Sequence, residues 1–142
     1  MKISTKGRYG LRIMVDLASN AGDKPRMVSD ICKAQGLSPK YAGRLILKLK
    51  NAGMISSVRG AGGGYRLKRQ PRRISILEII EAMEGDINIV DCVNCPKKCA
   101  RSKNCAARSI WCTLNKKIRD DLESVSLQDV LDIDEASFDY CI

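Results

Sequence analysis

Five of the seven cysteines lie together in the second half of the chain, between positions 92 and 112. They are Cys92, Cys95, Cys99, Cys105 and Cys112. Thiolates are preferred ligands of zinc, copper(I) and iron–sulfur clusters, and proteins in a reducing compartment rarely use cysteines for structural disulfides. The charged N-terminus lacks the apolar run of a secretory signal, so we expect a cytoplasmic protein. The spacing therefore predicts a site for a soft metal or for redox chemistry.

Charge is divided unevenly along the chain. Residues 1–73 carry 17 Lys and Arg against 3 Asp and Glu, a net charge of +14, whereas residues 74–142 carry 8 against 13, a net charge of −5. A basic half of this kind favours a polyanion such as DNA, because each neutralised phosphate releases condensed counterions. A merely solvated basic surface is the alternative. No apolar run approaches a membrane span, so we expect no membrane partner.

Apolar residues at helical spacing predict three helices in the basic half, over 4–20, 28–36 and 39–51. Ser38 and Pro39 form a start signal for the third helix, since serine caps free backbone amides and proline at the first position gives up no hydrogen bond. The second and third helices follow each other across a tight turn. This arrangement predicts a helix-turn-helix.

The next segment has the pattern of a β-hairpin. Residues 54–59 and 65–68 are predicted strands, and the residues between them include Gly60 and four further positions rich in glycine. Glycines let such a tip approach a sugar-phosphate backbone closely, and Arg59 and Arg66 lie where they could enter a minor groove. A nucleotide-binding phosphate loop is disfavoured, because no Gly-Lys-Ser/Thr ending is present and a strand follows. The hairpin is therefore interpreted as a wing.

Three further helices follow. Ser75 and Glu78 form a capping box that starts a helix running to Gly85. A long helix over 105–125 has an apolar stripe made of Ile110, Leu114, Ile118, Leu122 and Val125. A helix of this length is longer than a small core can cover, so we expect its stripe to be buried against a second chain. Ser126 caps a last short helix, which is expected to fold back on the dimer.

Together these patterns predict a mainly α fold with a small β-hairpin wing. The expected organisation is a winged helix-turn-helix DNA-binding domain over 1–85, a cysteine-rich loop over 86–104, and a dimerisation helix with a C-terminal tail over 105–142. Cys32 is expected to be a buried small side chain and Cys141 an exposed thiol in the tail.

Three stretches carry a specific likeness to known proteins: residues 4–9, Leu37-Ser38-Pro39-Lys40-Tyr41 at the start of the third helix, and the run from Asn51 through the wing to Tyr65. In these stretches the chain resembles the IscR-type family of bacterial winged-helix transcriptional regulators. The resemblance covers essentially the whole chain. It implies a homodimer on a palindromic double-stranded DNA operator, with each third helix in a major groove and each wing in an adjacent minor groove.

The resemblance also implies an iron–sulfur cluster as cofactor. Cys92, Cys99 and Cys105 occupy the places of three cluster-binding cysteines in such relatives. The fourth ligand differs, because Arg108 stands where a relative has histidine and the chain contains no histidine. Cys95 is the preferred substitute and Cys112 the other candidate. Both two-iron and four-iron clusters suit four cysteines.

Two other states of the thiols stay open. Four closely spaced thiolates also suit a structural zinc site, and the opening sequence of the chain is similar to the cluster-free CymR branch of the family, in which the thiols would be uncoordinated. An enzyme using Cys92 and Cys95 as a dithiol pair is disfavoured, because the usual βαβ setting is missing from the predicted elements.

We expect DNA contacts from Lys40, Tyr41 and Arg44 at the exposed start of the third helix, and from Arg59 in the wing. Position 43 is glycine, so no side chain reads a base there. The predicted function is a DNA-binding repressor, not an enzyme, whose operator affinity changes with a cluster that senses iron, redox or nitric oxide status. The alternatives are a cluster-free repressor of cysteine metabolism and a zinc-stabilised regulator.

Overall fold

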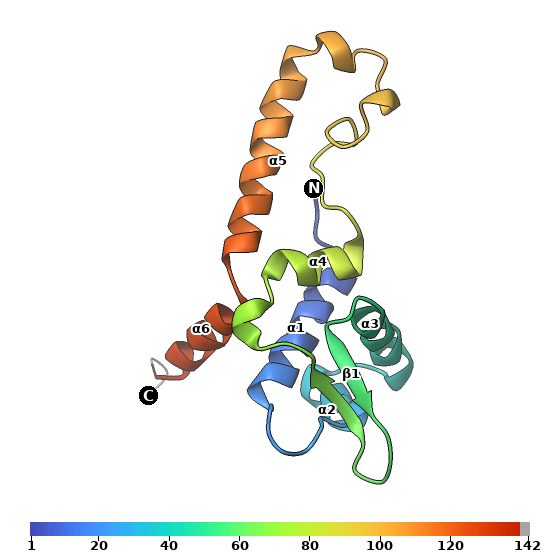
Figure 1. Ribbon diagram of the computed structural model, residues 1–142, viewed down its shortest axis with the longest axis vertical. Helices are drawn as coiled ribbons and strands as arrows, with labels where there is room; N and C mark the ends of the chain where they lie inside the picture. Colours follow the sequence, from blue (N-terminus) through green and yellow to red (C-terminus); the bar gives the residue numbers. More distant parts are fainter. Residues whose placement is uncertain (140–142) are drawn as a thin grey trace.

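The computed structural model describes the backbone of residues 1–139 and the side chains of residues 1–136. In this part of the chain six α-helices and one antiparallel hairpin are present (Figure 1). Their bounds are α1 Thr5–Ser19, α2 Val28–Gln35, α3 Pro39–Asn51, β1 Ile55–Val58, β2 Gly64–Leu67, α4 Ile76–Glu84, α5 Ala106–Ser124 and α6 Leu127–Asp139. Short 3-10 turns, labelled η1 to η3, occupy Pro71–Arg73, Pro96–Lys98 and Ser102–Asn104. The predicted fold class is confirmed.

The body of the molecule consists of α1 to α4 and the hairpin, and α5 rises away from it beside the segment that joins α4 to α5 (Figure 1). Helices α1 and α4 pack together at the centre, where the side chain of Met83 lies against Gly10 so closely that a Cβ at position 10 would collide with it. The largest fully buried side chains include Ile13, Ile31, Leu45, Leu49, Ile55 and Ile79. Cys32 belongs to this core, as predicted.

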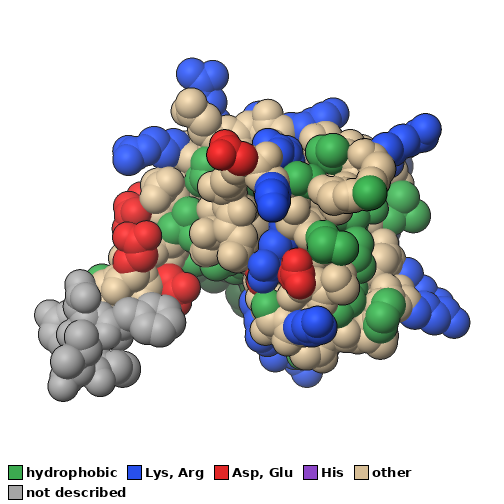
Figure 2. Space-filling view, turned by 90° about the horizontal axis from the view of Figure 1, so that it is seen from below, with side chains coloured by type: hydrophobic (Ala, Val, Ile, Leu, Met, Phe, Trp, Pro, Cys, Tyr) green, Lys and Arg blue, Asp and Glu red, His purple; other side chains and the backbone are tan. Residues whose placement is uncertain are grey.

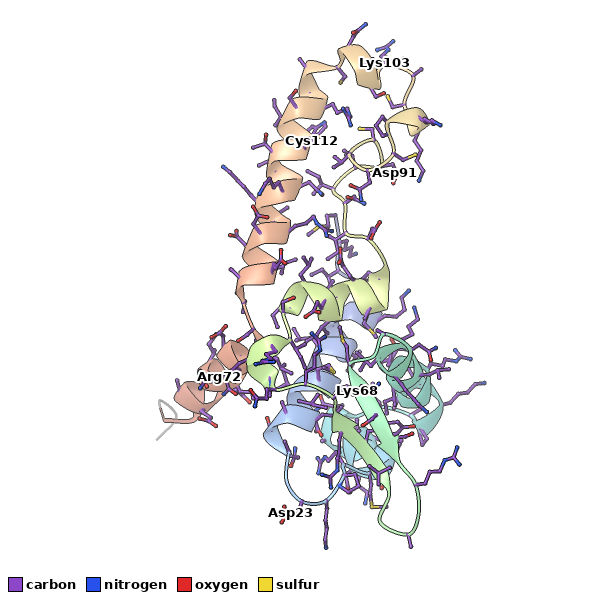
Figure 3. The ribbon with its side chains drawn as sticks, in the orientation of Figure 1. Asp23, Lys68, Arg72, Asp91, Lys103 and Cys112 are labelled. Atoms are coloured by element: carbon purple, nitrogen blue, oxygen red, sulfur yellow. The ribbon has the colours of Figure 1, made fainter. Side chains whose placement is uncertain are left out.

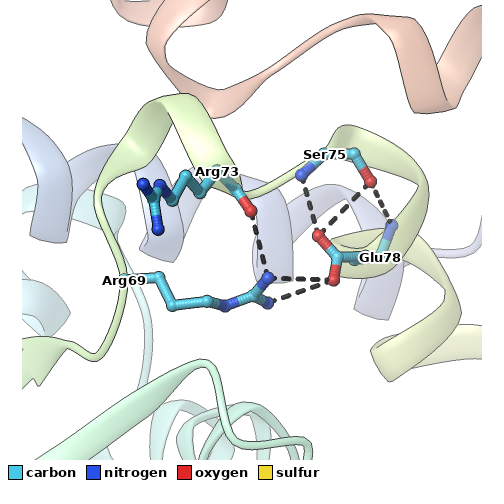
Figure 4. Close-up of polar contacts among 4 residues, drawn as sticks. All are labelled: Arg69, Arg73, Ser75 and Glu78. Atoms are coloured by element: carbon cyan, nitrogen blue, oxygen red, sulfur yellow. Dashed lines mark hydrogen bonds and ion pairs between the residues drawn. The ribbon is translucent and has the colours of Figure 1, made fainter.

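The predicted helix starts are confirmed at the level of single hydrogen bonds. The Ser38 hydroxyl accepts from the backbone N–H of Tyr41 at 3.2 Å. Ser75 and Glu78 form the predicted capping box, with bonds of 3.2 Å and 3.0 Å (Figure 4). Arg69 donates to the same Glu78 carboxylate at 3.1 Å and to the carbonyl of Arg73 at 3.0 Å. The segment between the wing and α4 is therefore fixed at the start of α4.

The last helix packs on its own chain. Ser126 and Asp129 cap it as a pair, with Asp129 accepting from the Ser126 backbone at 2.7 Å. Leu127, fully buried, donates its N–H to the carbonyl of Ile74 at 2.8 Å, and α6 then contacts α1 and η1. The last helix therefore folds back, as expected, and the contacts observed are with the body of its own chain. Cys141 lies outside the described residues.

Glu84 joins the C-terminus of α4 to the N-terminus of α1. Its carboxylate accepts from the backbone N–H of Ser4 at 3.0 Å, from the Ser4 hydroxyl at 2.5 Å and from the N–H of Gly7 at 3.1 Å. Burial opposes ionisation of this group, but the hydrogen bonds and the charge of Lys6 outweigh burial and hold the pKa of Glu84 below its ordinary value. A carboxylate at a helix N-terminus is also favoured by the helix dipole.

We predict that Glu84→Gln lowers the free energy of unfolding near neutral pH by about 1 kcal/mol, because a neutral amide oxygen is a weaker acceptor than a carboxylate. Because the folded pKa of Glu84 is depressed, this stabilisation is present above the ordinary carboxyl pKa and is lost as pH falls through the folded pKa. Urea unfolding at neutral pH and at about pH 3 measures the difference.

The matched control is Glu135→Gln, which removes an exposed carboxylate on α6. It should change stability little at either pH. A Glu84→Gln difference of equal size at both pH values would show that the charge of Glu84 is not what stabilises the junction.

Candidate DNA-binding surface and thiol loop

The outward side of α3 carries the predicted DNA-contacting residues. Ala42, Leu45, Ile46 and Leu49 are buried and face the core. Lys40 and Arg44 are exposed on the opposite side, and Tyr41 is half-buried on one flank. Two of the three predicted α3 residues are therefore exposed to solvent. Tyr41 is held partly by packing.

Tyr41 is anchored to α1 and α2 through a chain of side chains. Its ring meets the ring of Tyr9 edge-on, with centroids 6.2 Å apart. The guanidinium of Arg12 lies 5.0 Å from the Tyr9 centroid, and its Nε donates to the side-chain oxygen of Gln35 at 2.9 Å. The amide of Gln35 in turn donates to Asp16 at 3.2 Å. The start of α3 is therefore oriented by residues of two other helices.

The predicted wing is present, but β1 is shorter than the predicted strand over 54–59, and β2 lies one position earlier than the predicted strand over 65–68. Ile55 pairs with Leu67 and Val58 with Gly64. Arg59, at the start of the tip, is exposed. Arg66 is engaged elsewhere, because its guanidinium donates to the carbonyl of Asp23 in the loop between α1 and α2. Of the two wing arginines considered from the sequence, the structure leaves Arg59 directed to solvent.

An ion pair that sequence reasoning missed fixes the position of the wing. The backbone of Arg26 pairs with Tyr65 of β2 through bonds of 3.0 Å and 2.9 Å, so it adds a bridge alongside the hairpin. The guanidinium of Arg26 binds the carboxylate of Asp16 at 2.8 Å, and the Asp16 side chain is only 5% exposed. The hydrogen bond to Asp16 raises the pKa of Arg26 above its usual range, although burial acts against this. Gly64 is required here, because a Cβ would collide with the Arg26 backbone.

A signal for this pair was present in the sequence. Asp16 stands among the apolar positions of α1, next to the turn occupied by Ile13, Met14 and Leu17. An acid on a buried helix face indicates a buried partner. Its identity depended on how the loop between α1 and α2 returns, which the local sequence does not specify. Figure 2 shows Lys and Arg side chains spread over this lower end of the body, with most of the acidic side chains in view on the side of α6.

The thiol loop, residues 86–105, runs beside the upper half of α5 (Figure 1). Cys92, Cys95 and Cys99 are half-buried along it, and Cys105 is the N-cap of α5. All are free thiols. Cys112 is half-buried on α5 itself, next to the loop that carries Asp91 and Lys103 (Figure 3).

Two side chains of α5 hold the loop in place. The Nε of Arg108 donates to the carbonyl of Cys92 at 3.0 Å. Asn115, only 4% exposed, accepts from the N–H of Ile89 at 2.9 Å and donates to the side chain of Asn88 at 3.3 Å. Arg108, Cys112 and Asn115 follow each other at four- and three-residue spacing, so Cys112 shares the face of α5 that meets the loop.

The cysteines suit a soft metal by chemistry, but the described arrangement does not form a metal site. No three metal-binding side chains come close enough together to hold an ion among residues 1–136. Arg108, which the resemblance placed where a relative has histidine, donates to the loop backbone and cannot be a ligand. Ligation by Cys92, Cys95, Cys99 and Cys105 would require the loop to close around the metal.

The upper part of α5 exposes an apolar face. Ile110 is 58% exposed and Leu114 41% exposed, whereas Leu122 packs against the core of the body. Arg119 forms an ion pair with Glu81 of α4, which joins the lower part of the helix to the body. Val125, below Leu122, is 36% exposed. The stripe predicted from the sequence is therefore covered by its own chain only in part, where Leu122 meets the body. Within residues 1–139 no helix combines the length and apolar character needed to cross a membrane.

Residues 3–133 match the Rrf2 family, described as an iron-dependent transcriptional regulator. The chain is 38% identical to the transcriptional regulator CymR of Bacillus subtilis over 92% of this chain and 89% of that protein. It is 34% identical to IscR of Aliivibrio salmonicida over 92% of this chain and 77% of that protein.

Solved structures agree with these matches. The structure of CymR, the global cysteine regulator of B. subtilis, superposes with a TM-score of 0.81 at 36% identity, covering 94% of this chain and 98% of that one. The structure of T. potens IscR superposes with a TM-score of 0.78 at 37% identity, covering 96% and 90%. With a family match over most of its length, relatives of this identity and a shared winged-helix fold, the chain belongs to the Rrf2 family of helix-turn-helix transcriptional regulators.

Proposed function

We propose that this regulator binds its operator as a homodimer, with α3 in a major groove, the wing on an adjacent minor groove, and the thiol loop as the sensing element. The observation that carries the DNA-binding surface is the exposure of Lys40, Arg44 and Arg59. None of these three side chains forms a hydrogen bond or ion pair within the described part of the chain. Their charges are therefore free to neutralise phosphates or to meet base edges.

We predict that Arg59→Ala weakens binding to a duplex selected from a randomised library. The slope of log affinity against log salt should become shallower by about 1, because one fewer counterion is released. Fluorescence anisotropy titrations over a series of salt concentrations measure both quantities.

Lys116→Ala is the matched control, since it removes one exposed positive charge from α5, off the face that carries Ile110 and Leu114 and away from α3 and the wing. Its salt slope should equal that of the wild type. An unchanged slope in Arg59→Ala would exclude Arg59 from the DNA contacts.

The exposed face of α5 supports the dimer. The helix has 19 residues, which corresponds to a length of about 28 Å. The exposed Ile110 and Leu114 lie four residues apart on it, a spacing that suits packing against a second copy of the same helix. A two-fold dimer places two recognition helices on two half-sites, so a palindromic operator is expected.

We predict that Leu114→Glu shifts the protein from dimer to monomer and lowers operator affinity by at least tenfold, because it places a charge in an apolar interface and separates the half-sites. Sedimentation velocity gives the oligomeric state. The control is Thr113→Glu, which adds the same charge to the neighbouring exposed position, off the stripe. A Leu114→Glu dimer as stable as the Thr113→Glu dimer would place the interface elsewhere.

For the sensing element we propose an iron–sulfur cluster held by Cys92, Cys99 and Cys105, with Cys95 as fourth ligand. The family match to an iron-dependent regulator supports this proposal. So do the thiol types and the positive charges of Lys97, Lys98, Arg101 and Lys103, which offset thiolate charge. A bound cluster would supply iron chemistry that oxygen or nitric oxide can alter.

The loop is well placed to influence DNA binding. The hydrogen bonds of Arg108 and Asn115 connect the loop to α5, and the ion pair of Arg119 with Glu81 connects α5 to α4. A coupling free energy of about 1–3 kcal/mol would change operator affinity roughly 5- to 150-fold. The CymR similarity favours a second candidate, in which the thiols regulate the same loop without a cluster.

We predict that anaerobically purified protein contains matched iron and sulfide, and that Cys95→Ala loses them while Cys112→Ala retains them. A visible absorption spectrum with iron, sulfide and zinc assays measures this. Bleaching by Cys112→Ala alone would make Cys112 the fourth ligand. Zinc without sulfide would replace the cluster with a structural metal, and a metal-free protein after reconstitution would favour the cluster-free regulator.

A further inference from the structure

A large apolar side chain stands on the outward face of the recognition helix. Leu47 is 56% exposed, although α3 buries its other leucines completely or nearly so: Leu45 is 2% and Leu49 0% exposed. An isolated exposed leucine needs no explanation on most surfaces. This one lies in the middle of a basic helix that is proposed to face DNA.

Leu47 continues the line of the two exposed cations. Lys40, Arg44 and Leu47 follow each other at four- and three-residue spacing, so they form one stripe on the side opposite the core. At a rise of 1.5 Å per residue, Lys40 and Leu47 are separated along the helix by about 10 Å, which is about three base-pair steps. The stripe can therefore meet neighbouring base pairs in one groove.

The surroundings of Leu47 leave its side chain accessible. A Cβ placed at Gly43, one turn earlier, would meet no atom within 4 Å, so a base edge can approach there. The next residue, Lys48, directs its ammonium to the carbonyl of Met83 at 3.2 Å, on the flank that packs toward α4. Leu47 is thus an exposed apolar side chain with open space at Gly43 on one side and Lys and Arg side chains nearby.

We propose that Leu47 is a specificity-determining residue that contacts the 5-methyl group of a thymine in the major groove. This inference rests on the proposed binding mode of α3. Among the base edges in the major groove, only thymine presents a methyl group. The positive charges of Lys40 and Arg44 on the same stripe fit a polyanion that surrounds this methyl group, and suit an apolar protein partner poorly. The leucine would therefore select a T·A pair at one position of each half-site.

The test removes one methyl group at a time from the DNA. A duplex is first selected from a randomised library with the full-length dimer, and each thymine in one half-site is then replaced singly by deoxyuridine. Wild-type affinity should fall about fourfold at one position, the value expected for one buried methyl group. Leu47→Ala should bind the thymine duplex several-fold more weakly and should lose nothing further on the uracil substitution. The two changes thereby form a double-mutant cycle.

Val58→Ala is the matched control, because Val58 is another exposed apolar side chain in the DNA-binding region, 40% exposed and located in the wing. It should keep the wild-type sensitivity to deoxyuridine. Equal wild-type affinity for the thymine and uracil duplexes at every position, or an unchanged sensitivity in Leu47→Ala, would overturn the role of Leu47 while DNA binding stands. Failure of the dimer to enrich any duplex would remove the proposed function as well.

Discussion

The buried ion pair between Asp16 and Arg26 determines how the parts of the DNA-binding surface are placed relative to one another. A carboxylate with a side chain 5% exposed is costly to bury without a partner. Arg26 and Gln35 satisfy it from two directions. Through the backbone of Arg26 the pair reaches the wing, and through Gln35 it reaches Arg12, Tyr9 and the start of α3. One charged group on α1 thereby orients both elements that would contact DNA.

The body and α5 differ in how their apolar surface is covered. Inside the body, α1 and α4 pack closely. The side chain of Met83 lies so near Gly10 that a Cβ at position 10 would collide with it. Helix α5 extends away from the body. Within the described part of the chain, its upper half packs only against the thiol loop. The thiol loop, which is proposed as the sensing element, therefore rests on a helix whose only buried residue is Asn115. A change in the loop meets less resistance there than it would within the core.

The structure divides the Lys and Arg side chains of the basic half into two groups, those bonded within the chain and those directed to solvent. Arg26, Arg66 and Lys48 are all engaged by groups of the same chain. Lys40, Arg44 and Arg59 remain directed to solvent. The net charge of the basic half indicated a polyanion partner, but the net charge does not distinguish the bonded side chains from the solvent-directed ones. Charges that position the wing and charges that can contact phosphate are distinguished only by their partners.

The sequence by itself determined the elements, because their signals are local. Ser38 with Pro39, Ser75 with Glu78, and the alternating strands around the glycines depend on residues within a few positions of each other, and each produced the expected helix or hairpin. The stripe on α5 was likewise visible from spacing alone.

The tertiary structure decided what no local signal contains. It placed Arg26 on Asp16, bound Arg108 to the carbonyl of Cys92, and returned α6 to α1. It also left the thiols of the loop dispersed, although their spacing had suggested a compact site. Each of these contacts joins residues from different elements or from a long connecting segment. Such contacts depend on the packing of whole helices, which is set by the combined burial of many side chains and not by the residues that finally meet.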